Sequence, residues 1–341
     1  MSLLQISLLG AVIGVPLGYA MQRTNLCFNS AYRETLLNRN TVLLRAIALV
    51  ILVQMVGLAL VVQIGIGEVQ INVVPFFWLA TIIGGFVFGV SMVYAEGCSS
   101  TVWYRMGNGN MGALVTLIGF ALGEAVTSFG FLKGLRETLQ GPQLVPADGS
   151  LATLPNFLGI NPWLIVLPIA LVFGLWLARS AGGAHLGGWD WRRAGLTLGI
   201  IGVVAWIVAW PTGWHYGVGI VGATSPFVQA LFEGPGVLNW GSFMVLSLPL
   251  GAFVAAWRKR QLRLQIPNAS STFRMLTAGG LMGISATIAG GCNIGHTFTG
   301  VPTLALSSLT ATVAIFFGAW FGNYVRFLRP KLTKSYGIET K

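Results

Sequence analysis

The stretch Ala289-Gly290-Gly291-Cys292-Asn293-Ile294-Gly295-His296 is a run of glycine and polar residues between two apolar segments. Shorter related stretches surround the other two cysteines of the chain. In all three places one glycine lies nine residues before the cysteine, and a second lies thirteen residues before it. The sets are Gly14/Gly18/Cys27, Gly85/Gly89/Cys98 and Gly279/Gly283/Cys292. Because all 3 cysteines obey this G-x3-G-x8-C spacing, we interpret them as parts of one recurring structural unit.

The composition places the chain in a lipid bilayer. Its 341 residues are 55% hydrophobic and only 9% charged, and its mean hydropathy is +0.75. A soluble domain carries about 25% charged residues, so this chain cannot cover a water-facing surface. The net charge of +11 does not indicate nucleic-acid binding, because the basic residues form short clusters between apolar runs. Residues 1–20 lack a basic start and a small-residue cleavage site, so we expect a spanning helix there and not a signal peptide.

Apolar segments of about 20 residues are long enough to span a bilayer. We predict an all-α polytopic membrane protein with about nine such helices, plus short broken or re-entrant helices. The predicted spans are residues 3–22, 42–64, 73–94, 111–132, 162–179, 194–212, 238–257, 274–289 and 303–327. The turn-rich segment 133–161 links two halves, about 1–140 and 160–330. We therefore expect a single membrane domain, residues 1–341, built from two pseudo-symmetric halves.

The basic residues predict the orientation of the chain in the membrane. The clusters are Arg33, Arg39 and Arg45; Arg179, Arg192 and Arg193; Arg258, Lys259, Arg260, Arg263 and Arg274; and Arg326, Arg329, Lys331, Lys334 and Lys341. If the spans alternate, all four clusters lie on one side, which the positive-inside rule assigns to the cytoplasm. We therefore expect a periplasmic N-terminus and a cytoplasmic C-terminus. Lys133 and Arg136 are exceptions and fall on the opposite side.

The cysteine stretches are too polar for the centre of a spanning helix and too apolar for an exposed loop. Lipid cannot hydrogen-bond to backbone, so non-helical segments survive at membrane depth only when buried in protein or lining a wet cavity. We expect these stretches, with Pro211-Thr212-Gly213-Trp214, to form broken elements that meet near the midplane, as in inverted-repeat transporters. The glycine pairs have a simpler explanation as well, since small residues four apart let helices pack closely.

The same stretches are rich in groups that bind anions. Glycine backbones and broken helix ends offer N–H groups, and a neutral buried thiol is a weak, soft donor. Such donors suit a soft, sulfur-bearing anion better than a hard oxyanion. Glu96 is a rare intramembrane acid that needs a partner. Arg105 is the candidate for that partner, and the alternative, equally open from the residues, places Arg105 at the cytoplasmic rim. The candidate path residues are Asn25, Cys27, Glu96, Gly97, Cys98, Ser99, Arg105, Gly291, Cys292, Asn293, Gly295 and His296, and the candidates for steering anions at the outer mouth are Lys133 and Arg136.

Three motifs in this chain together resemble the YeeE/YedE family of sulfur-compound transporters. They are Arg23-x3-Cys27-Phe28-Asn29 with Arg33; Gly97-Cys98-Ser99-Ser100 with Arg105-Met106-Gly107-Asn108-Gly109-Asn110; and Gly290-Gly291-Cys292-Asn293-Ile294-Gly295-His296 with Gly300 and Leu306-Ser307-Ser308-Leu309. The resemblance covers nearly the whole chain.

The resemblance implies a multi-pass protein of the cell inner membrane that imports thiosulfate. It also implies a route along the family's cysteines, which map to Cys27, Cys98 and Cys292, and a small cytoplasmic TusA-like sulfur carrier (YeeD) as partner. Some relatives are linked to selenium metabolism, so a selenium-compound transporter of the same fold stays open.

Two other chemistries stay open from the residues alone. The three cysteines and His296 are the ligand types of a Cys3His zinc site, although no C-x2–4-C pair is present. A membrane thiol oxidoreductase or sulfurtransferase would relay persulfide through the cysteines, but that chemistry needs an accessible thiolate, and the chain lacks C-x-x-C. We expect no metal, no cofactor and no enzymatic activity. Without a phosphate-binding loop, the driving force comes from a gradient or from chemical trapping inside the cell.

Overall fold

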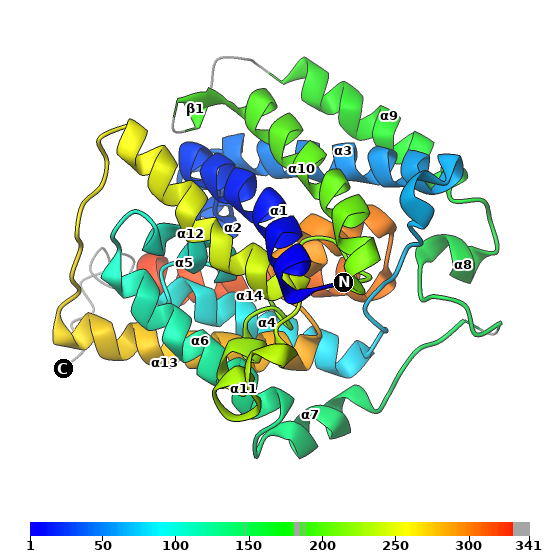
Figure 1. The fold of residues 1–341 in the computed structure, drawn as a ribbon. Coiled ribbons are helices and arrows are strands. Elements are labelled where there is room, and N and C mark those ends of the chain that lie inside the picture. The colour runs from blue at the N-terminus through cyan, green and yellow to red at the C-terminus, as the bar shows by residue number, and fades with distance from the viewer. Residues whose placement is uncertain (147, 181–184, 187, 330–341) are drawn as a thin grey trace.

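The computed structural model describes residues 1–146, 148–180, 185–186 and 188–329, and this part is almost entirely helical (Figure 1). The long helices are α1 (Leu3–Thr24), α3 (Val42–Ile64), α4 (Trp78–Tyr94), α6 (Met111–Ser128), α9 (Trp163–Arg179), α10 (Trp191–Ala209), α12 (Trp240–Arg258), α13 (Ala269–Ala289) and α14 (Leu306–Asn323). The short ones are α2 (Phe28–Asn38), α5 (Ser99–Met106), α7 (Lys133–Gln140), α8 (Leu154–Leu158) and α11 (Ser225–Glu233). Two short antiparallel strands, β1 (His185–Leu186) and β2 (Trp189–Asp190), precede α10.

Helical turns of other kinds complete the described chain. Segments Ile66–Glu68, Trp210–Thr212, Pro235–Val237 and Val301–Thr303 are 3₁₀ turns, and Ile294–Gly300 and Tyr324–Leu328 are π-helical. The π-helix Ile294–Gly300 directly follows the Cys292 stretch. Because π-helical turns are frequent at functional sites, its position makes this region a candidate.

The predicted all-α polytopic membrane class is confirmed. In the described residues, seven helices are long and apolar enough to cross a bilayer, and an eighth crossing results if Ala269–Ala289 and Ile294–Thr303, which are bent by 48°, form one span. The helix α9 is apolar but has only 17 residues. Each of the nine predicted spans overlaps one long helix, and the total of nine crossings stays a prediction. Lys331, Lys334 and Lys341 of the last basic cluster lie outside the described residues.

The surface of the helices is apolar, as a lipid-facing surface requires. The helix α9 lies at the edge of the molecule beside α3 (Figure 1), and Leu164 and Leu171 on it are 65% and 64% exposed. Phe253 on α12 and Phe317 on α14 are also exposed. Exposure of such side chains to water would destabilise the protein, because the transfer of apolar surface out of water is favourable. The bilayer is the environment in which they are stable.

The long helices pack in two reciprocal sets. In the first set, α1 packs on α12 and α10 packs on α3, while α1 and α10 touch each other. In the second set, α4 packs on α14 and α13 packs on α6, while α4 and α13 touch each other. Each of the helices α1, α4, α10 and α13, which precede the breaks, therefore packs on a long helix from the other side of the segment 133–161.

The glycine pairs lie at these helix contacts. A Cβ atom added to Gly14 or Gly18 would overlap with the carbonyl oxygens of Met244 and Leu248 on α12. Gly279 and Gly283 face the carbonyl oxygens of Thr116 and Phe120 on α6 in the same way. In the remaining pair, Gly89 faces the Ile315 carbonyl of α14, whereas at Gly85 the added atom would lie 3.0 Å from the Ala314 side chain. Small residues thus allow backbone-to-backbone packing of the kind seen between membrane helices. Each helix that leads to a cysteine is fixed in depth by its glycine pair.

Gly18→Ala is expected to destabilise the fold by about 1–3 kcal/mol, because the added methyl group overlaps with the Leu248 carbonyl and forces α1 away from α12. Gly174→Ala on α9 is the matched control, since a Cβ there meets no atom within 4 Å. Alanine is the better helix former, so this control keeps or raises the stability. Thermal unfolding in detergent measures both variants. An unfolding temperature for Gly18→Ala equal to that of wild type would contradict the close-packing assignment.

Candidate functional site

The three helices that lead to the cysteines end in the same backbone structure. The residue that ends each helix is left-handed: Asn25 after α1 (φ 49°), Glu96 after α4 (φ 60°) and Gly290 after α13 (φ 80°). The next N–H bonds to the carbonyl five residues back, namely Leu26 to Met21 (3.2 Å), Gly97 to Met92 (3.2 Å) and Gly291 to Ala286 (2.9 Å). This is the Schellman motif, which satisfies carbonyls that a helix end leaves free. In every case the cysteine follows the left-handed residue by two positions.

Each cysteine also begins the next helical segment. The carbonyl oxygens of Cys27 and Cys98 accept from Ala31 N (2.9 Å) and Val102 N (3.1 Å) at the starts of α2 and α5. The carbonyl of Cys292 accepts from His296 N (2.8 Å) in the π-helix. We call this arrangement, a helix closed by a left-handed cap and then a cysteine that starts a new helical segment, the cap-and-cysteine unit. It explains the fixed spacing, because the glycine pair sets the depth of the helix and the cap sets the position of the thiol.

The three units meet in the interior. The side chains of Cys27 and Cys98 lie close together, and the Cys292 thiol lies close to Ser99 and to the backbone N–H groups of Ile294 and Gly295. The buried Ser99 hydroxyl forms no hydrogen bond within the described part of the chain. All three thiols are free and fully buried. The Cys98 sulfur also lies 3.1 Å from the Thr101 hydroxyl and 3.4 Å from that of Ser100. The three cysteine stretches therefore lie near one another in the interior, and their meeting at the membrane midplane stays a prediction.

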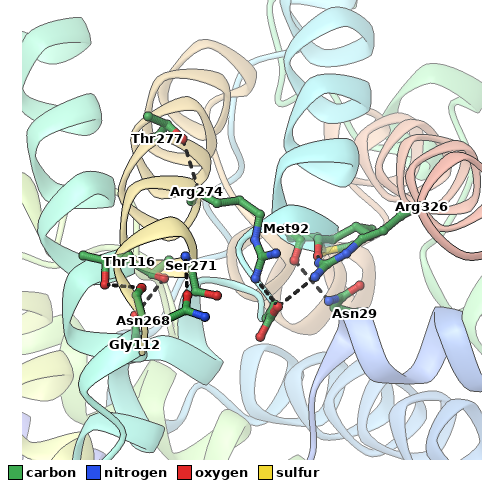
Figure 2. Close-up of polar contacts among 12 residues, drawn as sticks. Asn29, Met92, Gly112, Thr116, Asn268, Ser271, Arg274, Thr277 and Arg326 are labelled. Atoms are coloured by element: carbon green, nitrogen blue, oxygen red, sulfur yellow. Dashed lines mark hydrogen bonds and ion pairs between the residues drawn. The ribbon is translucent and has the colours of Figure 1, made fainter. Parts of the chain in front are cut away.

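Met92 is the point at which the asparagines of two units meet. The amide of Asn29 donates to the Met92 carbonyl at 3.0 Å, a contact visible in Figure 2, and the amide of Asn293 lies 3.2 Å from the Met92 sulfur.

Three of the candidate path residues form the helix caps themselves: Asn25 is the left-handed cap residue of α1, and Gly97 and Gly291 provide the cap N–H groups. These residues are consequently structural parts of the breaks, in addition to any contact with a ligand.

A cavity of about 380 Å³ opens beside the Cys292 unit. It is lined by the backbone of Gly290, Gly291 and Gly295 and by the side chains of Trp214, His215 and Tyr216. The Tyr216 hydroxyl donates to the Gly295 carbonyl at 2.8 Å. Asn72 also lines it, so the cavity lies at the end of the bundle where α4 begins and α13 ends. We call it the glycine-lined cavity.

His296 is fully buried, and both ring nitrogens already have partners. Nδ1 lies 3.1 Å from the Ser308 hydroxyl, and Nε2 lies 3.2 Å from the Ala289 carbonyl. Across the described residues, no group of three or more His, Cys, Asp or Glu side chains is arranged to share a metal ion. The ring ties the π-helix to the end of α13 and to α14.

Glu96 lies at the opposite end of α4 from the glycine-lined cavity. Its carboxylate oxygen Oε1 accepts from Arg274 at 2.6 Å and from Arg326 at 2.7 Å (Figure 2). The expected partner, Arg105, instead donates to the Glu96 backbone carbonyl at 3.2 Å. Arg105 also lies near the thiols of Cys27 and Cys98. The pairing with Arg274 and Arg326 is invisible in the sequence, because these residues are separated from Glu96 by 178 and 230 positions.

Lys133 and Arg136 belong to α7 and do not line the cysteine centre. Both form ion pairs with Glu137, at 3.9 Å and 3.7 Å. The last residue of α7, Gln140, donates to the carbonyls of Thr287 and Ile288 at 3.1 Å and 2.9 Å. These carbonyls directly precede the Cys292 unit, so α7 lies on the same end of the bundle as the glycine-lined cavity.

Glu124 is a candidate residue that the sequence analysis missed. It lies on α6, is fully buried, and accepts from the N–H of Gly222 at 2.5 Å. It also lies close to Ser225 at the start of α11, and its second carboxylate oxygen has no hydrogen-bond partner among the described residues. The signal was present, since Glu124 is the acidic residue of the predicted span 111–132 and intramembrane acids are rare.

A bundle of lipid-facing helices whose polar breaks meet at a buried centre defines a polytopic membrane transport protein. The sequence comparison places it more narrowly. The chain belongs to the sulphur transport family, whose profile matches residues 23–321. Its role is accordingly transport rather than catalysis.

Two relatives of this chain are named thiosulfate transporter TsuA. The protein of Spirochaeta thermophila is 34% identical over 330 residues, which cover 94% of this chain and 99% of the relative. The protein of Escherichia coli is 31% identical over 342 residues, covering 94% and 95%. A probable transporter YedE of Salmonella typhimurium is 32% identical over 91 residues, covering 26% of this chain and 23% of the relative.

Proposed function

We propose that this chain imports thiosulfate, or a closely related sulfur-containing anion, across the inner membrane along the thiols of Cys27, Cys98 and Cys292. The observation that carries the proposal is the convergence of the three cap-and-cysteine units on one buried centre. The two relatives named as thiosulfate transporters, which match almost the full length of the chain, support the substrate.

The contacts suggest an order for the path. The anion enters the glycine-lined cavity and meets the N–H groups of Ile294 and Gly295 beside the Cys292 thiol. Ser99 links Cys292 to the pair formed by Cys98 and Cys27, beyond which Arg105 lies. Each step offers neutral N–H, O–H or S–H donors, and the thiols are soft partners for a terminal sulfur atom. The anion would thus bind weakly at several successive sites. Conduction requires such weak binding, because the anion must be able to leave each site.

We infer that the breaks are re-entrant and that the chain consists of two related halves. The reciprocal packing of α1, α3, α10 and α12, and of α4, α6, α13 and α14, supports a two-fold relation between the halves. In this relation the turn Trp210–Thr212 at the end of α10 corresponds to the Cys27 unit, without a cysteine.

Cys98→Ala and Cys292→Ala are expected to lower thiosulfate uptake into proteoliposomes about tenfold, the effect of losing a donor worth about 1.4 kcal/mol in a rate-determining step. Cys27→Ala should have a smaller effect, because Cys27 lies between leucine and phenylalanine and its backbone is less open. Ser285→Ala is the control, since this buried hydroxyl bonds to Leu281 within its own helix. Full uptake by both the Cys98 and Cys292 variants would refute the thiol path.

The corresponding serine variants separate hydrogen bonding from persulfide chemistry. Serine keeps a hydrogen-bond donor but replaces the soft S–H group with a hard O–H group. Thiosulfate uptake should therefore be reduced in part, and competition by selenium analogues and by sulfite should change. A persulfide relay instead predicts loss of uptake in every serine variant and an adduct of about 32 Da, one sulfur atom, on the wild type. Intact-mass measurement after exposure to thiosulfate distinguishes the two.

We further propose that the N-terminus is periplasmic and the C-terminus cytoplasmic, which puts the glycine-lined cavity outside and Glu96 with its arginines inside. A TusA-like sulfur carrier is then the expected acceptor on the inner side. A cytoplasm-active reporter fused after Lys341 should be active in cells. An inactive fusion of a correctly inserted protein would reverse the proposed direction of the path.

Lys133 and Arg136 are proposed to steer anions toward the glycine-lined cavity. Glu137 offsets part of their charge at 3.9 Å and 3.7 Å, so the double change to Ala should lower uptake only severalfold. The loss should be larger at limiting substrate and at low salt than at saturation. Glu137→Gln, which removes the offsetting charge, should raise uptake under the same conditions. Unchanged uptake in both variants would show that these are ordinary loop charges.

A further inference from the structure

The Glu96 carboxylate lies in a cluster of arginines drawn from three distant parts of the chain. Arg274 near the start of α13 and Arg326 in the π-helix after α14 both donate to the same oxygen, Oε1 (Figure 2). Arg105 of α5 donates to the backbone carbonyl of the same residue. Two guanidinium groups thus pair with the carboxylate and a third bonds to the backbone of the same residue, so positive charge is in excess at this point.

Arg326 is the buried member of the cluster, since the side chains of Arg274 and Glu96 are 38% and 43% exposed. The Arg326 side chain is only 19% exposed, and it also donates to the Val93 carbonyl at 2.5 Å. Its guanidinium lies over the rings of Tyr94 and Phe327, at 5.8 Å and 5.1 Å from their centroids. Burying an arginine costs free energy unless an anion and further acceptors compensate. Arg326 is therefore stabilised by an anionic partner, and Glu96 supplies it in this state.

The backbone of Glu96 has a conformation that glutamate does not favour, although Glu68 adopts it elsewhere in the chain. Glu96 occupies the left-handed position that Asn25 and Gly290 occupy in the other two units. Asparagine and glycine adopt this conformation readily, whereas other residues pay about 1–2 kcal/mol. The glutamate at this unfavourable position is explained if its carboxylate is needed to pair with Arg274 and Arg326.

We propose that Arg105, Arg274 and Arg326 form an oxyanion-binding release site at the end of the cysteine path, and that Glu96 is its internal occupant, displaced when the transported anion arrives. The inference rests on the proposed function. Planar guanidinium groups match the oxygen atoms of a sulfonate-like group, while the thiols of Cys27 and Cys98 behind Arg105 face its terminal sulfur. With no anion present, Glu96 ties α4 to α13 and to the end of α14, which keeps the exit closed.

The test uses sulfate, an oxyanion without the terminal sulfur, as a probe of the arginine site alone. Glu96→Gln removes the competing charge, and Glu96→Asn does so with a residue suited to the left-handed position, so at least one variant is expected to fold. In both, sulfate should bind about tenfold more tightly than in wild type, the gain expected when one competing charge is removed. It should also raise the unfolding temperature more than in wild type. Glu34→Gln is the matched control, because Glu34 forms an exposed pair with Arg33 at 3.7 Å.

Two further measurements complete the test. Proteoliposomes loaded with thiosulfate should leak faster with the Glu96→Asn variant than with wild type or Glu34→Gln, and adding Arg326→Gln to Glu96→Asn should abolish the protection by sulfate. Equal sulfate protection in wild type and both Glu96 variants, or an unchanged leak, would overturn the proposal. Failure of wild type to take up thiosulfate would instead refute the proposed function, while sulfate protection would still report on the arginine site.

Discussion

The constraint on which this structure depends is that lipid offers no hydrogen bonds to a broken helix. The chain breaks helices at Asn25, Glu96 and Gly290, and each break closes its own carbonyls with a Schellman motif before the next helical segment begins. Because the caps satisfy the backbone locally, the segments that follow can enter the interior of the bundle. The buried thiols and the N–H groups beside Cys292 are therefore available at the centre without leaving the surrounding backbone unpaired.

The position of the breaks depends on close helix packing as well as on the caps. A break is useful only if the helix before it is held at a fixed depth, and the glycine pairs provide this by bringing backbones together at Leu248 on α12 and Phe120 on α6. The spacing of thirteen and nine residues between glycine and cysteine is thus a distance along a helix, plus a cap of fixed length. The same glycine–cysteine spacing therefore determines both how the helices pack and where the thiols lie.

Much of the fold was predictable because the signals are local. The nine apolar segments overlap the nine long helices, and the cysteine spacing indicated the three breaks and their convergence. The Schellman caps could have been anticipated at Gly290 and Asn25 from residue preference, but not at Glu96, which is unfavourable there. Contacts between distant residues, such as Arg326 with Glu96 or Asn293 with Met92, are set by tertiary packing that no sequence period reports. Glu124 was missed although its position in a spanning segment carried the signal.

The distribution of charge along the path follows from the cost of burying ions. The hydroxyls of Ser100 and Thr101 that contact the Cys98 thiol are neutral, whereas a cation in direct contact with the anion at every step would hold a divalent anion too tightly to release it. Formal charge appears at the end of α4, where Glu96 is 43% exposed and water screens the arginines. On the proposed path, an anion that leaves weak, soft donors would then meet strong, hard ones that already hold a carboxylate. Exchange of one anion for another costs less than filling an empty arginine site, because the guanidinium groups are never left unpaired. A protein arranged in this way can bind its substrate at the exit without trapping it.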